Sequence, residues 1–487
     1  MSVRRNTAYN IAGAAVPVAA MALAVPPYLN AIGEERYGVL AVLWTLLGYL
    51  GLFDLGLGRA VTNRIAMLHR ESAERREAVF WTALGLNLAL GMVGAGLLWG
   101  VAALVFEFAV DVPAGLALEV REALPWMALA FPLLLTSSVM SGALMGREQF
   151  LHQNAVRIGE GALVQFAPLA VALTVGPELR GLVLTVLAVR SMSSLGLFAL
   201  CVRRLPTGLR PRIDRFEVRP LFVYGGWVTA TSAIGPLLST LDRVLIGAIA
   251  GVRSVAYYTV PYGVVTQITV LPGSLTAALF PRFSATPDPD ERRRLQAVGV
   301  RSVAAVVTPL VVVGLLTIEP VIRWWIDPAF ATVAGPTGVL LLPGVWANCL
   351  AYVPYTSLQG GGRPDVVAKV HAAELVPYLL LLWWALHEFG AAGAAAAWSV
   401  RTTTDMAALG FLSGLSRQAA RNVLVSGGLV VAALVAALAE PGLAIRLGLG
   451  VALAGAAVWV GYGQIRPILL RRTLPEEPTG RVAEPPR

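Results

Sequence analysis

Long apolar stretches alternate with short polar segments along most of this chain. Windows of about 20 residues, enough for a helix to cross a hydrocarbon core of about 30 Å, recur from the amino terminus almost to the carboxyl terminus. The pattern predicts an all-α integral membrane protein with about fourteen transmembrane helices. The expected spans are 6–29, 37–58, 80–105, 123–145, 160–176, 181–201, 220–248, 255–281, 297–318, 335–358, 367–386, 391–413, 422–439 and 444–465.

The amino terminus has features of a secretory signal peptide. Arg4 and Arg5 precede an apolar run that contains the small-residue triplet Ala22-Leu23-Ala24. That run extends over 6–29, which is longer than the apolar core of about 7 to 15 residues in signal peptides. We therefore expect an uncleaved first helix.

Basic residues concentrate in every second loop, as they do in loops that stay on the cytoplasmic side of a membrane. With the amino terminus inside, the predicted cytoplasmic segments hold most of the 38 Lys and Arg residues, and 202–219 is the most basic of them. Acidic residues such as Glu34, Glu107 and Glu178 lie at the opposite helix ends. This asymmetry predicts that both termini are cytoplasmic.

The position of the basic loop suggests how the chain is organised. Six predicted spans precede it and six follow, before a terminal helix pair. The expected parts are a six-helix lobe at 1–203, a basic cytoplasmic linker at 204–219, a second six-helix lobe at 220–416, a terminal helix pair at 417–466 and a disordered cytoplasmic tail at 467–487.

A weak internal repeat relates the two predicted lobes. Pro17 precedes the segment 31–38 at about the distance at which Pro236 precedes 249–257. In each case a proline-bearing helix is expected to reach the outer surface, turn through Gly and a short charged loop, and re-enter through Tyr. Duplicated halves around a central site are a transporter layout. Chance similarity between low-complexity helices is the alternative.

Composition agrees with a membrane protein. Hydrophobic residues make up 56% of the 487 residues and charged residues 14%, with a formal net charge of +9. In a soluble protein this charge would suggest nucleic acid, but here the basic residues sit between apolar runs. Cys201 and Cys349 both fall inside apolar spans, and the four histidines are far apart. Neither a disulfide framework, a metal site nor a cofactor is expected.

Two stretches of the sequence carry a family resemblance. The first consists of Pro27-Tyr28-Leu29, Ile32-Gly33, Tyr37-Gly38, Gly48-Tyr49 and Phe53-Asp54-Leu55-Gly56-Leu57-Gly58-Arg59-Ala60. The second consists of Ser239-Thr240-Leu241-Asp242-Arg243-Val244-Leu245-Ile246-Gly247, Val255-Ala256-Tyr257-Tyr258 and Leu279-Phe280-Pro281-Arg282-Phe283-Ser284. In order and spacing they resemble the polysaccharide-type flippases, which include O-antigen flippases, of the multidrug, oligosaccharidyl-lipid and polysaccharide exporter superfamily.

The resemblance implies a fold and a cargo. Members of this family have two six-helix lobes around a V-shaped cavity that opens alternately to either side. They turn over polyprenyl-pyrophosphate-linked oligosaccharides for cell-surface polysaccharide synthesis. By this resemblance the expected partners are membrane lipids, the lipid-linked glycan and other polysaccharide assembly proteins. We also expect no nucleic-acid partner and a monomeric carrier.

Charged residues inside apolar spans are the candidate cargo ligands. An Arg or Asp near the middle of a bilayer costs about 2.5 to 3.5 kcal/mol on insertion scales and needs a partner or a wet cavity. Arg190, Arg401 and Asp405 are such residues, and Arg offers phosphate a planar fork of donors at any relevant pH. Arg401 and Asp405 are also four residues apart on one helix, so they can instead neutralise each other.

Other candidates have competing interpretations. Asp242 and Arg243 fall nearer the outer end of their span, where gating or interface snorkelling is expected as much as cargo contact. Asp54 lies beside Gly56 and Gly58, which favours helix-end or lobe packing.

A further candidate pair could couple transport to an ion. His371 and Glu374 share a helix face, where a protonatable pair could use a proton gradient, although a solvated role near the membrane surface is the favoured alternative.

Three function classes remain after this reading. A membrane-embedded glycosyl polymerase would need a large outer loop or an acidic catalytic cluster, and the outer segments 106–122 and 319–334 hold neither. A cation-coupled drug exporter of the same superfamily typically has twelve spans. The sequence therefore favours a non-enzymatic, multi-pass flippase of the inner membrane that works by alternating access.

Overall fold

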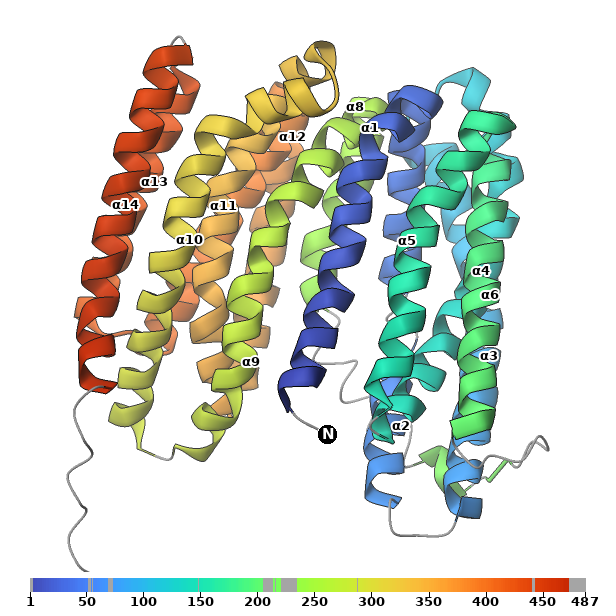
Figure 1. Ribbon diagram of the computed structural model, residues 1–487. Coiled ribbons are helices and arrows are strands. Elements are labelled where there is room, and N and C mark those ends of the chain that lie inside the picture. The colour runs from blue at the N-terminus through green and yellow to red at the C-terminus, as the bar shows by residue number, and fades with distance from the viewer. Residues whose placement is uncertain are drawn as a thin grey trace, which may run out of the picture. The chain divides into compact units, whose positions relative to one another are not determined.

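The computed structural model describes most of the chain, and every regular element in the described residues is a helix (Figure 1). This confirms the all-α class. The described residues are 3–472 except 51–53, 55, 69–72, 148, 205–212, 215, 220–233, 287 and 440–442. The α-helices are α1 Val3–Leu50, α2 Leu57–Met67, α3 Ala73–Leu104, α4 Ala114–Gly146, α5 Phe150–Thr174, α6 Leu179–Arg204, α8 Ile234–Val265, α9 Val270–Ala285, α10 Pro289–Trp325, α11 Pro328–Gly360, α12 Pro364–Leu412, α13 Arg417–Leu438 and α14 Leu443–Arg472. Two short helices of other types, η3 Val105–Ala109 and η4 Thr266–Thr269, extend α3 and join α8 to α9.

Hydropathy and length together establish a multi-pass membrane protein. In the part of the chain that the structure describes, nine helices are long and apolar enough to cross a membrane. Hydrocarbon offers no hydrogen-bond partners to backbone N–H and C=O groups. A helix pairs these groups internally, so the apolar runs fold as helices. The count of fourteen spans and the cytoplasmic termini stay predictions. The start of span 220–248, most of the linker 204–219 and the tail beyond residue 472 lie outside the described residues.

Two of the long helices, α1 and α8, reverse direction at a glycine. Gly33 has φ 79° and ψ 163°, and Gly251 has φ 80° and ψ 162°, a conformation that side-chain-bearing residues rarely adopt. The hydroxyl of Tyr258 donates to Asp242 Oδ2 at 2.6 Å, although sixteen residues of straight helix would span about 24 Å. Each of these helices is therefore a hairpin of two helices, broken where the sequence predicts a turn.

The same backbone angles relate the two segments of the predicted internal repeat. In the register set by Gly33 and Gly251, Tyr37 matches Val255 rather than Tyr257. The conformation therefore repeats, while the tyrosines are offset by two positions.

Helix α12 also folds back on itself, at Gly390 with φ 56° and ψ −138°. A Cβ atom at Gly393 would overlap the carbonyl oxygen of Ala385, eight residues earlier. Those positions would be about 12 Å apart in a straight helix. The break falls between the predicted spans 367–386 and 391–413.

Several helices are longer than their predicted spans, because polar turns continue the helix beyond the apolar window. The predicted loop 59–79 carries α2 and the start of α3. Helix α2 buries Leu57, Val61 and Ile65, which lie four residues apart on one face. Helix α5 begins at Phe150 rather than near residue 160.

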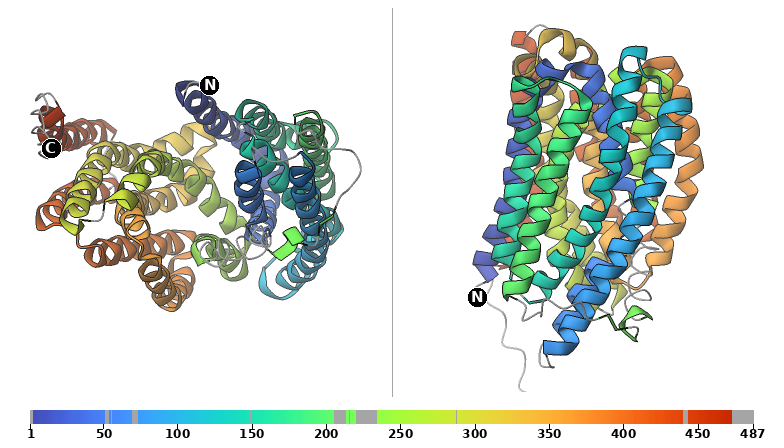
Figure 2. Two further views of the ribbon diagram at one scale, coloured as in Figure 1. Left: turned by 90° about the horizontal axis from the view of Figure 1, so that it is seen from below. Right: turned by 90° about the vertical axis from the view of Figure 1, so that its right-hand side faces the viewer.

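The chain forms two compact units. Unit 1 comprises Met1–Val264, Pro320–Thr337 and His371–Ala397, and unit 2 comprises Val265–Glu319, Gly338–Val370 and Trp398–Arg487. In unit 1, α4 packs against α3 and α6, and α5 packs against α6 and α1 (Figure 2). In unit 2, α13 and α14 pack against each other (Figure 1). The boundaries of the two six-helix lobes stay a prediction.

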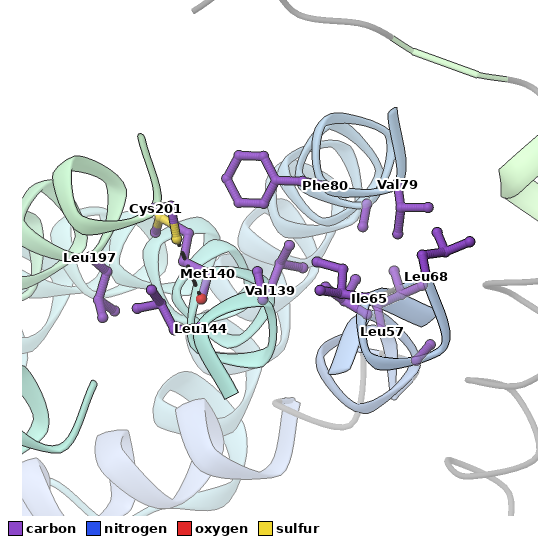
Figure 3. Packing of buried hydrophobic residues seen from close by; sticks show 14 residues of the cluster. Leu57, Ile65, Leu68, Val79, Phe80, Val139, Met140, Leu144, Leu197 and Cys201 are labelled. Carbon is purple, nitrogen blue, oxygen red and sulfur yellow. Dashed lines mark hydrogen bonds between the residues drawn. The ribbon is translucent and has the colours of Figure 1, made fainter. Parts of the chain in front are cut away.

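A buried cluster joins α2, α3, α4 and α6 within unit 1. Figure 3 shows Ile65, Phe80 and Val139 in this cluster, with Cys201 at its edge. The thiol of Cys201 lies 3.5 Å from the carbonyl oxygen of Met140 and is fully buried. It packs as a small apolar residue there.

Glycines allow α2 and α4 to approach closely. A Cβ atom at Gly142 would overlap the carbonyl oxygen of Gly58, and one at Gly146 would lie 2.9 Å from that of Thr62. The hydroxyl of Thr62 donates to the carbonyl of Gly142 at 3.1 Å. Such small-residue contacts are typical of helix pairs in membranes, where helices gain mainly from close packing.

We therefore predict that Gly142→Ala lowers the thermal stability of the purified protein in detergent. The added methyl group has to displace backbone atoms, which costs about 1–3 kcal/mol in a well-packed core. Gly96→Ala on α3 is the matched control, because a Cβ atom there meets nothing within 4 Å. Equal melting temperatures for the two variants would contradict the α2–α4 contact.

Candidate functional site

Arg190 lies in the interior of α6 and keeps part of its hydrogen-bonding capacity unused. Its Nη1 atom is 3.4 Å from Glu160 Oε1 on α5, and its guanidinium carbon lies 5.9 Å from the ring centroid of Trp44. The Arg190 side chain is 20% exposed. Its Nε atom is buried and has no hydrogen-bond partner among the described residues. An unsatisfied buried donor of this kind is costly, so it marks a place where a ligand oxygen would be stabilised.

Asp242 and Arg243 form a second polar cluster, on α8. Asp242 is fully buried and accepts hydrogen bonds from the hydroxyl of Tyr258 and, at 2.7 Å, from the backbone N–H of Arg243. The Arg243 guanidinium lies 4.5 Å from the ring centroid of Tyr262, and its Nη1 is 3.4 Å from Asp242 Oδ1. Asp242 therefore links Tyr258 to the backbone of Arg243, while the ring of Tyr262 makes a cation–π contact with the Arg243 guanidinium.

Arg190 and Arg243 line one cavity of about 510 Å³ inside unit 1. Its walls come from both arms of the α1 hairpin and from α4, α5, α6 and α8. The polar and aromatic lining residues are Tyr28, Tyr37, Trp44, Thr45, Gln165, Arg190, Arg243 and Thr259. The hydroxyl oxygen of Thr259 is also buried without a hydrogen-bond partner in the described part of the chain.

This arrangement suits an anion attached to a polar body. Two guanidinium groups provide donors for phosphate or carboxylate oxygens, and each already has a carboxylate neighbour that offsets its insertion cost. No carboxylate is among the cavity's described lining residues. The hydroxyl, amide and indole groups add neutral contacts of the kind that bind sugars or other polar groups. The lining is therefore chemically suited to an anionic, polar ligand.

Arg401 and Asp405 lie on the second arm of α12, in unit 2. Asp405 is 6% exposed and Arg401 is half-buried. They are not lining residues of the cavity that holds Arg190 and Arg243. Their predicted role in cargo binding stays a prediction.

Asp54 joins three helices of unit 1. Its carboxylate accepts hydrogen bonds from Asn87 Nδ2 on α3 at 2.6 Å, from Ser138 Oγ on α4 at 3.1 Å and from the N–H of Gly58 on α2 at 3.4 Å. These contacts hold the start of α2 against α3 and α4. The gating or lobe-packing role of Asp54 stays a prediction.

His371 and Glu374 lie one turn apart near the start of α12, and both are partly exposed. They are not among the residues that line the cavity with Arg190. Ion coupling through this pair stays a prediction.

The hairpins of α1 and α8 meet near their glycine turns, in a group of contacts that we call the hairpin seam. It comprises Glu34, Gly38, Val252, Arg253 and Tyr257. Glu34 forms an ion pair with Arg253 and accepts a hydrogen bond from the hydroxyl of Tyr257 at 2.6 Å. A Cβ atom at Gly38 would overlap the backbone of Val252, so the two hairpins touch through their main chains. All five residues belong to unit 1.

A second ion pair supports the α1 hairpin. Arg36 donates to both carboxylate oxygens of Glu119 on α4, at 2.6 and 3.0 Å, and Glu119 also accepts from the N–H of Leu179 at 3.2 Å. A two-point Arg–carboxylate contact fixes orientation as well as distance. It ties the α1 turn to α4 and to the start of α6.

Several of these residues have no distinguishing signal in the sequence. Glu160 is the first residue of the predicted span 160–176, whereas α5 begins ten residues earlier and places it inside the helix. The sequence signal for Glu160 is an acidic residue at the start of an apolar run. Trp44, Gln165 and Tyr262 carry no such signal, because their importance comes from neighbours on other helices.

Comparison with known proteins is consistent with this architecture. Residues 3–286 match the family model described as "Polysaccharide biosynthesis protein". A Shigella flexneri protein named "Putative O-antigen transporter" is 28% identical over 418 residues, which covers 85% of this chain and 98% of that protein.

Solved structures share the fold. The lipid II flippase MurJ in an inward closed conformation aligns with a TM-score of 0.72 at 12% identity, covering 95% of this chain and 98% of that one. An inward-facing multidrug resistance MATE family transporter of the MOP superfamily aligns with a TM-score of 0.68 at 14% identity, covering 85% and 94%. The family match extends over more than half of the chain and confirms the resemblance noted in the sequence. The chain belongs to the polysaccharide biosynthesis protein family.

Proposed function

We propose that this protein moves a polyprenyl-pyrophosphate-linked oligosaccharide from the cytoplasmic to the outer leaflet of the inner membrane. It acts as a carrier rather than an enzyme. The observation that carries the proposal is the convergence of Arg190 and Arg243 on one cavity, with the Nε of Arg190 unsatisfied. The family membership and the named O-antigen transporter support the same class of cargo.

The chemistry of the cavity matches the head of such a cargo. A pyrophosphate presents several anionic oxygens within a few ångströms, and two arginines can share them. Thr45, Thr259 and Gln165 offer neutral hydrogen bonds, and the indole of Trp44 offers a flat apolar face to a sugar ring. The isoprenoid chain is apolar and can remain in the bilayer while the charged head is shielded.

Transport across the membrane requires the cavity to open alternately to each side. The hairpin seam is the contact that must part if the α1 and α8 turns are to separate. Its ion pair stabilises the closed contact only weakly, because Arg253 is 62% exposed and an exposed ion pair contributes about 0–1 kcal/mol to stability. Such a contact can break and re-form in every cycle.

We predict that Arg190→Ala and Arg243→Ala each reduce glycan export in cells by about ten-fold or more, since each removes a charged donor from the phosphate. Surface glycan and the lipid-linked intermediate on the cytoplasmic leaflet are measured together in a deletion strain that carries each variant. The intermediate should accumulate as surface glycan falls.

Arg180→Ala is the matched control for these variants. Arg180 lies on the same helix as Arg190, but its side chain is 53% exposed and pairs only loosely with Glu122, at 3.8 Å. Protein abundance and elution as a single species are checked for every variant. Normal export by both cavity variants would refute the assignment, and Arg401→Ala in the same assay tests the predicted ligand in unit 2.

A disulfide across the hairpin seam should stop transport. We predict that Glu34→Cys with Arg253→Cys, in a background with Cys201→Ala and Cys349→Ala, blocks export on oxidation and recovers on reduction. Each single cysteine variant should export normally under both conditions. Full export with a complete cross-link would show that the seam need not open.

The same deletion strain separates the proposal from the alternative of a cation-coupled small-molecule exporter. A drug exporter predicts greater sensitivity to small cationic compounds and no lipid-linked intermediate. Mass spectrometry of the membrane lipids would distinguish the two results.

A further inference from the structure

Unit 2 contains a separate cavity of about 500 Å³ between α10, α13 and α14. It shares no lining residue with the cavity of unit 1. Its lining residues are Arg301, Gln418, Asn422, Val425, Trp459, Val460, Tyr462, Gly463 and Gln464. No acidic residue is among these described lining residues.

Arg301 is the cation of this cavity, and most of its donors are unused. The structure gives it one polar contact within the described residues, from Nε to the carbonyl oxygen of Ala297 at 3.1 Å. That contact leaves both Nη groups, with four N–H donors, for something else. The side chain is half-buried on an apolar helix. A positive group in this position is stabilised by an anion.

The neighbouring polar groups describe the rest of the ligand. Gln418 and Asn422 carry amides that both donate and accept. Gln464 is 8% exposed; its Nε2 donates to Ser426 Oγ at 3.3 Å, while its buried Oε1 accepts no hydrogen bond in the described part of the chain. An unsatisfied acceptor calls for a hydroxyl or N–H donor. The cavity thus offers a cation for one group and neutral hydrogen-bonding partners for another.

The rim of the cavity faces outward with aromatic side chains. Trp459 is 77% exposed and Tyr462 is 60% exposed. Trp and Tyr are enriched where lipid headgroups meet the hydrocarbon core. Gln418 and Asn422 lie in the first two turns of α13, next to Arg417 and Arg421, in a loop and helix start that the basic residues assign to the cytoplasmic side. With the predicted topology, this cavity is placed at headgroup depth on the cytoplasmic side.

We infer that this cavity binds the headgroup of an anionic phospholipid of the cytoplasmic leaflet. Arg301 holds the phosphate, and the amides of Gln418, Asn422 and Gln464 hold a neutral, hydroxyl-bearing headgroup such as glycerol. A choline or ethanolamine headgroup fits less well, because the described lining residues offer no carboxylate to its positive nitrogen. The inference does not depend on which cargo the protein carries.

A phospholipid fits this place better than the cargo does. A pyrophosphate carries more negative charge than one guanidinium can offset, whereas the cavity in unit 1 provides two arginines. The exposed Trp459 and Tyr462 leave the site open to surrounding lipid rather than enclosed. A resident phospholipid headgroup would occupy the cavity that α10, α13 and α14 line.

The test is lipid binding to the purified full-length protein in detergent, followed by native mass spectrometry and thermal denaturation. Phosphatidylglycerol should bind and raise the melting temperature, and phosphatidylcholine with the same acyl chains should do so much less. Arg301→Gln should weaken phosphatidylglycerol binding by about ten-fold, the loss expected for a charged hydrogen-bonded contact. Arg417→Gln, an exposed arginine on the same side that does not line the cavity, should bind as the wild type does.

A second variant keeps the test decisive if Arg301→Gln fails to fold. Asn422→Leu retains the charge, removes one amide and should lower phosphatidylglycerol affinity while Arg417→Gln does not. Equal binding of the two lipids, or equal binding by the cavity variants and the control, would overturn the inference. Displacement of phosphatidylglycerol by a polyprenyl phosphate at equal concentration would assign the cavity to the cargo instead. Failure of the export prediction for Arg190 and Arg243 would leave these results unaffected.

Discussion

Backbone groups in hydrocarbon have no water to bind, and the architecture of this protein depends on that constraint. Helices satisfy their own N–H and C=O groups, so apolar runs become helices and reversals are confined to short, special segments. At Gly33, Gly251 and Gly390 the chain turns within one or two residues by adopting positive φ. Helix packing then relies on close approach, which the glycines of α4 provide against α2. The cavity in unit 1 is enclosed by helices positioned in this way.

Each of the two arginines that line the cavity of unit 1 is paired locally with a carboxylate. Arg190 has Glu160 as its carboxylate neighbour, and Arg243 has Asp242, so neither guanidinium is an isolated charge in the protein interior. The two carboxylates, Asp242 and Glu160, differ in the hydrogen bonds that they make. Asp242 is fully buried and committed to Tyr258 and to the backbone, whereas Glu160 leaves the Nε of Arg190 unsatisfied. A site that binds and releases an anion benefits from this difference, because one cation is rigidly supported and the other has donors to spare.

The hydrophobic pattern was sufficient to predict the all-α membrane class and the turn regions, because helix length and apolar composition are local properties. Arg190 was also found locally, as a charge in an apolar run. Its place beside Trp44, Gln165 and Arg243 is not predictable, since those residues come from three other helices and meet only in the folded chain. The hydropathy pattern places Glu160 at a helix edge, because His152 and Arg157 lower the mean hydropathy of a segment that is helical from Phe150. Helix α2 was missed because eleven residues are too few to register as a span.

The matched turns at Gly33 and Gly251 carry different charges at corresponding positions. In the register set by their shared backbone angles, Glu34 corresponds to Val252 and Glu35 to Arg253. If the α8 turn carried the α1 sequence, a glutamate would replace Arg253 and face Glu34, and the contact would be repulsive. The ion pair between Glu34 and Arg253 exists only because the two copies of this shape differ in charge. The two turns share a backbone conformation, and the difference in their side chains makes the contact between them attractive.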